Sequence, residues 1–111
     1  MKSPQQKILE RKRQEVESKS FPEIQTILKG GANYFRAHIM YTLLDQPGLT
    51  LDQLNEIVGG EFKNISFHTR KLHGFGLLYK KSVDPYVQHY LSNEGKLLAQ
   101  FIKKLRQKNL L

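Results

Sequence analysis

The stretch that decides the fold runs from Leu49 to Leu77 and reads LTLDQLNEIVGGEFKNISFHTRKLHGFGL. Thr50 begins a Thr-x-x-Gln capping box, which predicts a helix over residues 51–58. The glycine pair 59–60 ends that helix, because glycine readily takes the left-handed conformation found after helix C-termini. A second helix is predicted over residues 62–73. The stretch therefore predicts two short helices joined by a tight turn.

Two strand-like runs follow this helix pair. The sequences LLYKKS (77–82) and YVQHYL (86–91) are rich in aromatic, β-branched and leucine residues. Asp84-Pro85 lies between them and is typical of a turn. We expect an antiparallel hairpin here. Ser92 then caps a last helix over residues 93–108.

Two further helices are predicted before the decisive stretch. Ser20 opens a Ser-x-x-Glu capping box, which favours a helix over residues 21–29 with Ile24, Ile27 and Leu28 facing inward. We expect Gly30 and Gly31 to stop it. Asn33 can cap another helix over residues 34–45.

These elements predict an α+β fold that is mainly α. Three segments are expected: a basic N-terminal arm at 1–20, a domain of helices and hairpin at 21–92, and a C-terminal helix at 93–111. The arm has too few apolar residues to define a buried stripe, so it is either disordered or a helix that orders against a partner.

Composition excludes several classes of protein. A chain of 111 residues is too short for an enzyme with a large cleft, and the absence of cysteine excludes disulfides, thiolate zinc sites and cysteine nucleophiles. The glycine pairs lack the following Lys-Ser/Thr of a phosphate-binding loop. We therefore expect no enzyme activity and no cofactor. Without a secretory signal or an uncharged apolar run of membrane-spanning length, we also expect no membrane association and a cytoplasmic location.

The net charge of +8 is unevenly distributed. Residues 62–83 carry five basic residues and no acidic one, whereas residues 21–61 carry two basic against five acidic. Residues 1–20 and 93–111 are both basic. One face of the molecule is therefore expected to be strongly positive, as a nucleic-acid-binding surface requires.

The residues from Leu49 onward resemble the winged helix-turn-helix of ArsR-type and MarR-type transcriptional regulators. NISFHTRKL (64–72) resembles the recognition-helix pattern T-V-S-x-H-L-x-x-L, and GFGLL (74–78) resembles the A-G-L-V step into the wing. YVQHYLS (86–92) is similar to the returning wing strand, and LSNEGKLLAQF (91–101) to the helix after it. The resemblance covers roughly residues 33–105.

The resemblance implies that helix 62–73 enters the DNA major groove and that the wing at 77–91 lies near the backbone. Asn64 can pair with an adenine edge, and Lys63, Lys71 and His68 can donate to guanine or phosphate. Core packing stays open as the role of both Phe62 and Phe67; if it is exposed, Phe67 could contact a thymine methyl group. The implied base-reading residues are Phe62, Lys63, Asn64, Phe67, His68 and Lys71. Ser66 and Thr69 are expected at the edge of this surface, Arg70 is expected to reach phosphate, and Lys80 and Lys81 lie at the base of the wing.

The sequence departs from the family pattern at three places. Phe67 replaces a residue that is usually polar, and Thr69 replaces a core leucine. The wing tip has Asp84, which phosphate repels, in place of the arginine that often enters the minor groove. Wing contacts are therefore expected from Lys80 and Lys81.

The favoured hypothesis is a sequence-specific transcriptional regulator that binds double-stranded DNA as a homodimer and is nucleoid-associated. An apolar stripe on the last helix motivates the dimer, with Leu98, Phe101, Ile102 and Leu105 as dimerisation residues. Two alternatives stay open: a winged-helix protein–protein interaction module, and a non-specific architectural nucleic-acid binder. Metal sensing is not expected, because cysteine is absent and His68 and His73 are five residues apart. The sequence shows no obvious small-molecule effector site.

Overall fold

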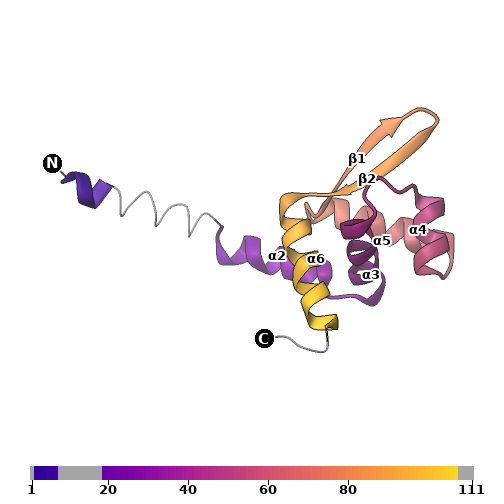
Figure 1. Cartoon of the computed structure of the whole chain (residues 1–111), viewed down its shortest axis with the longest axis horizontal. Helices are drawn as coiled ribbons and strands as arrows, with labels where there is room; N and C mark the ends of the chain where they lie inside the picture. The colour runs from indigo at the N-terminus through magenta and orange to yellow at the C-terminus, as the bar shows by residue number, and fades with distance from the viewer. Residues whose placement is uncertain (1, 8–18, 108–111) are drawn as a thin grey trace.

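The computed structural model describes residues 2–7 and 19–107. Its order of helices, hairpin and helix confirms the predicted fold class, and Figure 1 shows the arrangement. The expected arm falls largely on residues 8–18, which lie outside the described residues, as do residues 108–111 at the end of the predicted last segment. The elements are α2 (Phe21–Gly31), α3 (Tyr34–Asp45), α4 (Leu51–Val58), α5 (Phe62–Gly74), β1 (Leu78–Val83), β2 (Tyr86–Leu91) and α6 (Asn93–Arg106).

Four helices begin at the capping residues that the sequence predicts. The Ser20 Oγ accepts from the backbone N–H of Glu23, and the Asn33 Oδ1 accepts from two backbone N–H groups at the start of α3. At α4, Thr50 and Gln53 form the complete reciprocal capping box. The Ser92 Oγ accepts from the backbone N–H of Gly95. Each cap stabilises its helix by about 1 kcal/mol.

The prediction that Gly30 and Gly31 stop the first helix is wrong, because α2 continues through both residues. Their role is close packing. A Cβ atom at Gly30 would lie 2.5 Å from Cδ1 of Leu77, and one at Gly31 would lie 2.8 Å from Cδ2 of Leu98. By contrast, the pair at 59–60 has φ values of 86° and 89° and ends α4 as predicted.

The core lies around α3, which packs on α4, α5, α6 and β2. Leu54 of α4 and Ile65 and Leu72 of α5 are fully buried there. The remaining core residues are Ile39, Met40, Leu43, Val58, Leu77, Leu78, Leu91 and Ala99. This core fixes the angle at which α5 is presented.

The wing is a two-stranded antiparallel sheet, with register from Leu78 opposite Leu91 to Val83 opposite Tyr86. Asp84 and Pro85 form the predicted turn. The chain before α4 holds the base of the wing, because the Leu49 carbonyl accepts from both the backbone N–H and Nδ1 of His89, at 3.0 Å and 2.8 Å. The tip projects beyond the helices (Figure 1). Within the described ranges, no helix has the length and apolar character needed to cross a bilayer.

Candidate nucleic-acid interface

Helix α5 has one buried side and one exposed side. Ile65, His68, Thr69 and Leu72 recur at intervals of three and four residues and are buried. The Thr69 hydroxyl donates to the Ile65 carbonyl at 2.7 Å, so this residue also belongs to the interior rather than to the edge of the reading surface. The structure leaves Asn64 and Ser66 half-buried, and it exposes Phe62, Lys63, Phe67, Arg70 and Lys71.

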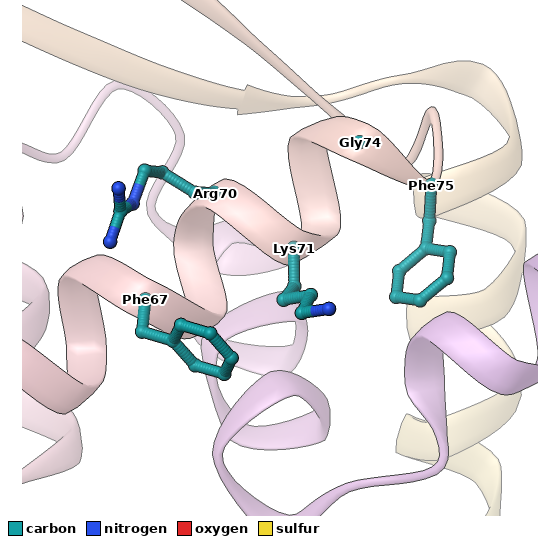
Figure 2. A pocket seen from close by; sticks show the side chains of 5 residues that line it. All are labelled: Phe67, Arg70, Lys71, Gly74 and Phe75. Carbon is teal, nitrogen blue, oxygen red and sulfur yellow. The ribbon is translucent and has the colours of Figure 1, made fainter.

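The exposed side of α5 carries unneutralised positive charge. Across residues 2–7 and 19–107, none of Lys63, Arg70 and Lys71 lies within ion-pair distance of a carboxylate. Lys71 instead places its Nζ 5.5 Å from the centroid of the Phe67 ring. Figure 2 shows the Lys71 side chain between the rings of Phe67 and Phe75. Such a surface attracts a polyanion and has donors to offer it.

Phe67 stands between two hollows on this side of the helix. One has a volume of about 430 Å³ and is lined by Phe67, Arg70, Lys71, Gly74 and Phe75 (Figure 2). The other has a volume of about 570 Å³ and is lined by Phe35, Gly60, Glu61, Lys63, Asn64, Phe67 and Arg70. Phe67 is 44% exposed, so its interpretation as a core residue is wrong. Phe62 is 46% exposed, so core packing is wrong for this residue as well.

His68 does not belong to the exposed side, which corrects the expectation that it contacts DNA. Only 8% of the residue is exposed, and its ring stacks on that of Phe35 with centroids 5.5 Å apart. Its Nδ1 accepts a hydrogen bond from Nη1 of Arg36 at 3.2 Å. The sequence did hold the necessary information: His68 lies three residues after Ile65 and four before Leu72, and so shares their face.

The surroundings of His68 favour the neutral form of its ring. Burial lowers its pKa, and the positive charges of Arg36 and Lys71 lower it further. The hydrogen bond from Arg36 is consistent with this, since a protonated imidazole would have no acceptor at Nδ1.

Arg36 joins three elements, and no sequence motif points to it. Its Nε donates to the Gly30 carbonyl at 2.6 Å and its Nη2 to the Lys29 carbonyl at 3.3 Å, both at the C-terminal end of α2. Its guanidinium also lies 5.5 Å from the ring centroid of Phe75, just after α5. We call Arg36, His68 and these two carbonyls the Arg36 clamp. It fixes α2 to α5, and only contacts distant in the sequence reveal it.

The two wing lysines point to opposite faces of the hairpin, because consecutive strand residues alternate. Lys80 lies opposite the buried His89, on the face turned towards the core. Lys81 lies on the other face with Tyr79 and Tyr90, whose rings stack 5.3 Å apart. Both lysines are exposed as predicted, but they do not form a single cluster.

The predicted dimerisation residues of α6 separate into two groups. Leu98 and Ile102 are half-buried against the body of the domain, whereas Phe101 and Leu105 are more than half exposed. Leu97, which is 70% exposed, extends the same outer stripe. Leu98 also packs close to Gly31 and so helps to hold α2 in place.

An apolar surface spans α2 and α6. Ile24 and Leu28 were expected to face inward but are exposed, because α2 packs through Ile27 and its two glycines and leaves these side chains on the outer side. They line a hollow of about 400 Å³ together with Leu97 and Phe101. We call this the α2–α6 surface; its residues are Phe21, Ile24, Leu28, Leu97, Phe101 and Leu105.

The arrangement of α3, α4, α5 and a hairpin followed by α6 decides the architecture. The fold is a winged helix. No protein-family model matches the chain, and no curated protein sequence matches it. Comparison with solved structures, however, confirms the resemblance to winged-helix transcriptional regulators of the ArsR and MarR type.

Three solved structures illustrate this similarity. Reduced HlyU from Vibrio cholerae N16961 is 27% identical, with a TM-score of 0.72 over 86% of this chain and 99% of HlyU. A predicted DNA-binding transcriptional regulator from E. coli is 18% identical, with a TM-score of 0.70 over 76% of this chain and 90% of that protein. A MarR family transcriptional regulator from Silicibacter pomeroyi DSS-3 is 16% identical, with a TM-score of 0.62 over 86% of this chain and 68% of that protein.

Proposed function

We propose that this protein is a sequence-specific transcriptional regulator that binds double-stranded DNA through the exposed side of α5. The observation that carries the proposal is the set of three cations, Lys63, Arg70 and Lys71, on the second helix of a helix-turn-helix, with no carboxylate partner in the described part of the chain. The names of the similar proteins, which include a DNA-binding regulator and a MarR family regulator, support it.

The exposed side of α5 suits a major groove about 12 Å wide. Lys63 and Lys71 are separated by about 12 Å along the helix axis, since each residue adds 1.5 Å, and this length matches about three to four base pairs. We expect Asn64 to pair with an adenine edge, and the cations to donate to guanine or phosphate. His68 is left out of this interface because it is buried.

We further propose that two copies associate through the α2–α6 surface. Six large apolar side chains are exposed there, and a patch of this kind on a small domain marks an interaction site. Phe101 and Leu105 keep the dimerisation role expected from the sequence, whereas Leu98 and Ile102 support the helix from beneath. A two-fold dimer places its recognition helices about one duplex turn apart, so the DNA site is expected to be roughly palindromic.

Selection of bound sequences from a random duplex pool tests the function directly. The wild type should enrich a palindromic site, and the double variant Lys63→Glu with Lys71→Glu should enrich none. The matched control is Lys96→Glu with Lys104→Glu, which changes the charge equally at exposed positions of α6. Loss of DNA binding in the control alone would instead indicate the non-specific binder, in which α6 supplies the contacts.

Salt dependence gives an independent measure of the interface. If each protomer neutralises about five phosphates, the logarithm of the binding constant should fall with the logarithm of salt concentration at a slope of about −9 for the dimer. An affinity that does not change with salt would contradict the proposal.

The α2–α6 surface also suits the alternative of an interaction module that binds another protein. Sedimentation of the wild type beside Phe101→Glu separates the two. A homodimer should become monomeric in Phe101→Glu but not in Gln100→Glu, which adds the same charge at the neighbouring exposed position. A wild type that is monomeric at high concentration would contradict the homodimer and favour a different partner.

A further inference from the structure

Phe67 is a large apolar side chain at the centre of a cationic surface. The ring packs edge-on against His68, with centroids 5.1 Å apart and planes at 75°. The Nζ of Lys71 lies over the ring. Between the two hollows that it borders, the ring is open to solvent. An aromatic side chain in this position can bind an apolar partner that tolerates the surrounding cations.

The major groove offers one such group. Its base edges present hydrogen-bond donors and acceptors, and the C5-methyl group of thymine is the apolar feature among them. A protein partner fits less well, because lysine is depleted in the centres of protein interfaces. The larger apolar area of this molecule lies elsewhere, on the α2–α6 surface. Phe67 therefore favours DNA over protein.

The ring is also held in place from behind. His68 supports it, and His68 is in turn fixed by stacking on Phe35 and by the hydrogen bond from Arg36. A contact group whose orientation is locked by the residues behind it discriminates better than a mobile one. The Arg36 clamp thus gives Phe67 the rigidity that methyl recognition needs.

We infer that Phe67 reads the C5-methyl group of a pyrimidine, and that Arg70 or Lys71 donates to a guanine beside it. The two cations lie three and four residues after Phe67, so they are its neighbours on the helix surface. The inference rests on the proposed DNA-binding function and adds the chemical class of base that α5 selects. Because 5-methylcytosine carries its methyl group at the same place as thymine, the site should respond to both.

The test is a thermodynamic cycle between one methyl group and one side chain. Thymines of the selected duplex are replaced singly by deoxyuridine, which removes the methyl group and keeps every hydrogen-bonding atom. Each half-site should contain one position at which this single replacement lowers the affinity of the wild type by about fourfold, the factor expected for burial of one methyl-sized group. Replacement in both half-sites should lower affinity by about sixteenfold.

The variant Phe67→Ala should bind more weakly and bind the thymine and deoxyuridine duplexes equally. Phe62→Ala is the matched control, an exposed phenylalanine on the same helix, and it should keep the discrimination of the wild type. The methyl group is tested in a second context by placing cytosine or 5-methylcytosine at the same position. The wild type should prefer 5-methylcytosine by about fourfold and Phe67→Ala should show no preference.

Equal binding of thymine and deoxyuridine duplexes by the wild type would overturn the inference, and this measurement needs no variant that might misfold. Discrimination that persists in Phe67→Ala would overturn it too, because another residue would then read the methyl group. Both results leave the proposed function intact, since the selected duplex is still bound specifically. Failure to select any duplex would instead refute the proposed function.

Discussion

Replacement of Arg36 by methionine should destabilise the fold and weaken DNA binding together. Methionine keeps much of the length of the side chain but removes the three hydrogen bonds of the Arg36 clamp, to Gly30, Lys29 and His68. It also removes the guanidinium from the face of Phe75. The variant thus removes the polar contacts through which Arg36 links α2 to α5, without creating a large cavity.

The magnitude follows from which partners water can reach. Gly30 is buried, so its carbonyl would lose a charged donor at 2.6 Å with no replacement. A hydrogen bond to a charged group contributes about 1.5–3 kcal/mol. His68 would also lose the donor to its Nδ1, whereas the exposed Lys29 carbonyl can bind water. We expect the free energy of unfolding to fall by roughly 2–3 kcal/mol in total.

Urea unfolding followed by circular dichroism measures this loss. The control is Arg106→Met, which removes a guanidinium 4.9 Å from the ring centroid of Tyr41 at an exposed site. An exposed cation–π contact contributes about 0.5–1 kcal/mol, so the control should lose clearly less. Affinity for the selected duplex should fall in Arg36→Met alone, because His68 then no longer supports Phe67. Equal losses in the two variants would refute the role assigned to the clamp.

Three further outcomes are expected. First, burial lowers the pKa of His68 and of His89, so the unfolded chain takes up protons below about pH 6.5 more readily than the folded one. The urea concentration at the midpoint of unfolding should therefore decrease when the pH is lowered from 7.5 to 5.5. An increase on acidification would contradict this. Second, Gly95→Ala should destabilise the fold severely, because its Cβ would overlap the Leu77 carbonyl oxygen, and a thermal melt unchanged from the wild type would argue against the close approach of α6 to Leu77. Third, Gly74→Ala, where a Cβ meets open space at the end of α5, should raise the free energy of unfolding by up to about 1 kcal/mol, and a loss of stability would show that the site is not open.

Features set by neighbouring residues could be predicted from the sequence. The caps at Ser20, Asn33, Thr50 and Ser92 were correct because each needs only a side-chain oxygen and a backbone N–H two or three residues later. The helix end at Gly59 was correct for a similar reason, as a positive φ is a local requirement.

Features set by packing between distant elements could not be predicted in the same way. Both glycine pairs look alike in the sequence, but only Gly59 and Gly60 end a helix. Gly30 and Gly31 are part of α2, where Leu77 and Leu98 approach them closely. The Arg36 clamp depends on the relative placement of α2, α3 and α5, which no short motif encodes.

For the candidate site, the resemblance to winged helix-turn-helix regulators was enough to find most of the exposed side of α5, including Lys63, Phe67 and Lys71. It failed for His68, which lies three residues after Ile65 and four before Leu72 and is therefore on the apolar face of the helix. The opposite error occurs in α2: the sequence predicts that Ile24 and Leu28 face the core, but they are exposed, because α2 packs through Ile27, Gly30 and Gly31.

Competition between the selected duplex and a random-sequence duplex, at one stated salt concentration, tests the central claim most directly. The wild type should prefer the selected duplex by at least about a thousandfold, the lower end for specific DNA-binding proteins. The variant Lys63→Glu with Lys71→Glu should lose that preference, while Lys96→Glu with Lys104→Glu keeps it. Equal affinity of the wild type for both duplexes would contradict sequence-specific recognition by α5.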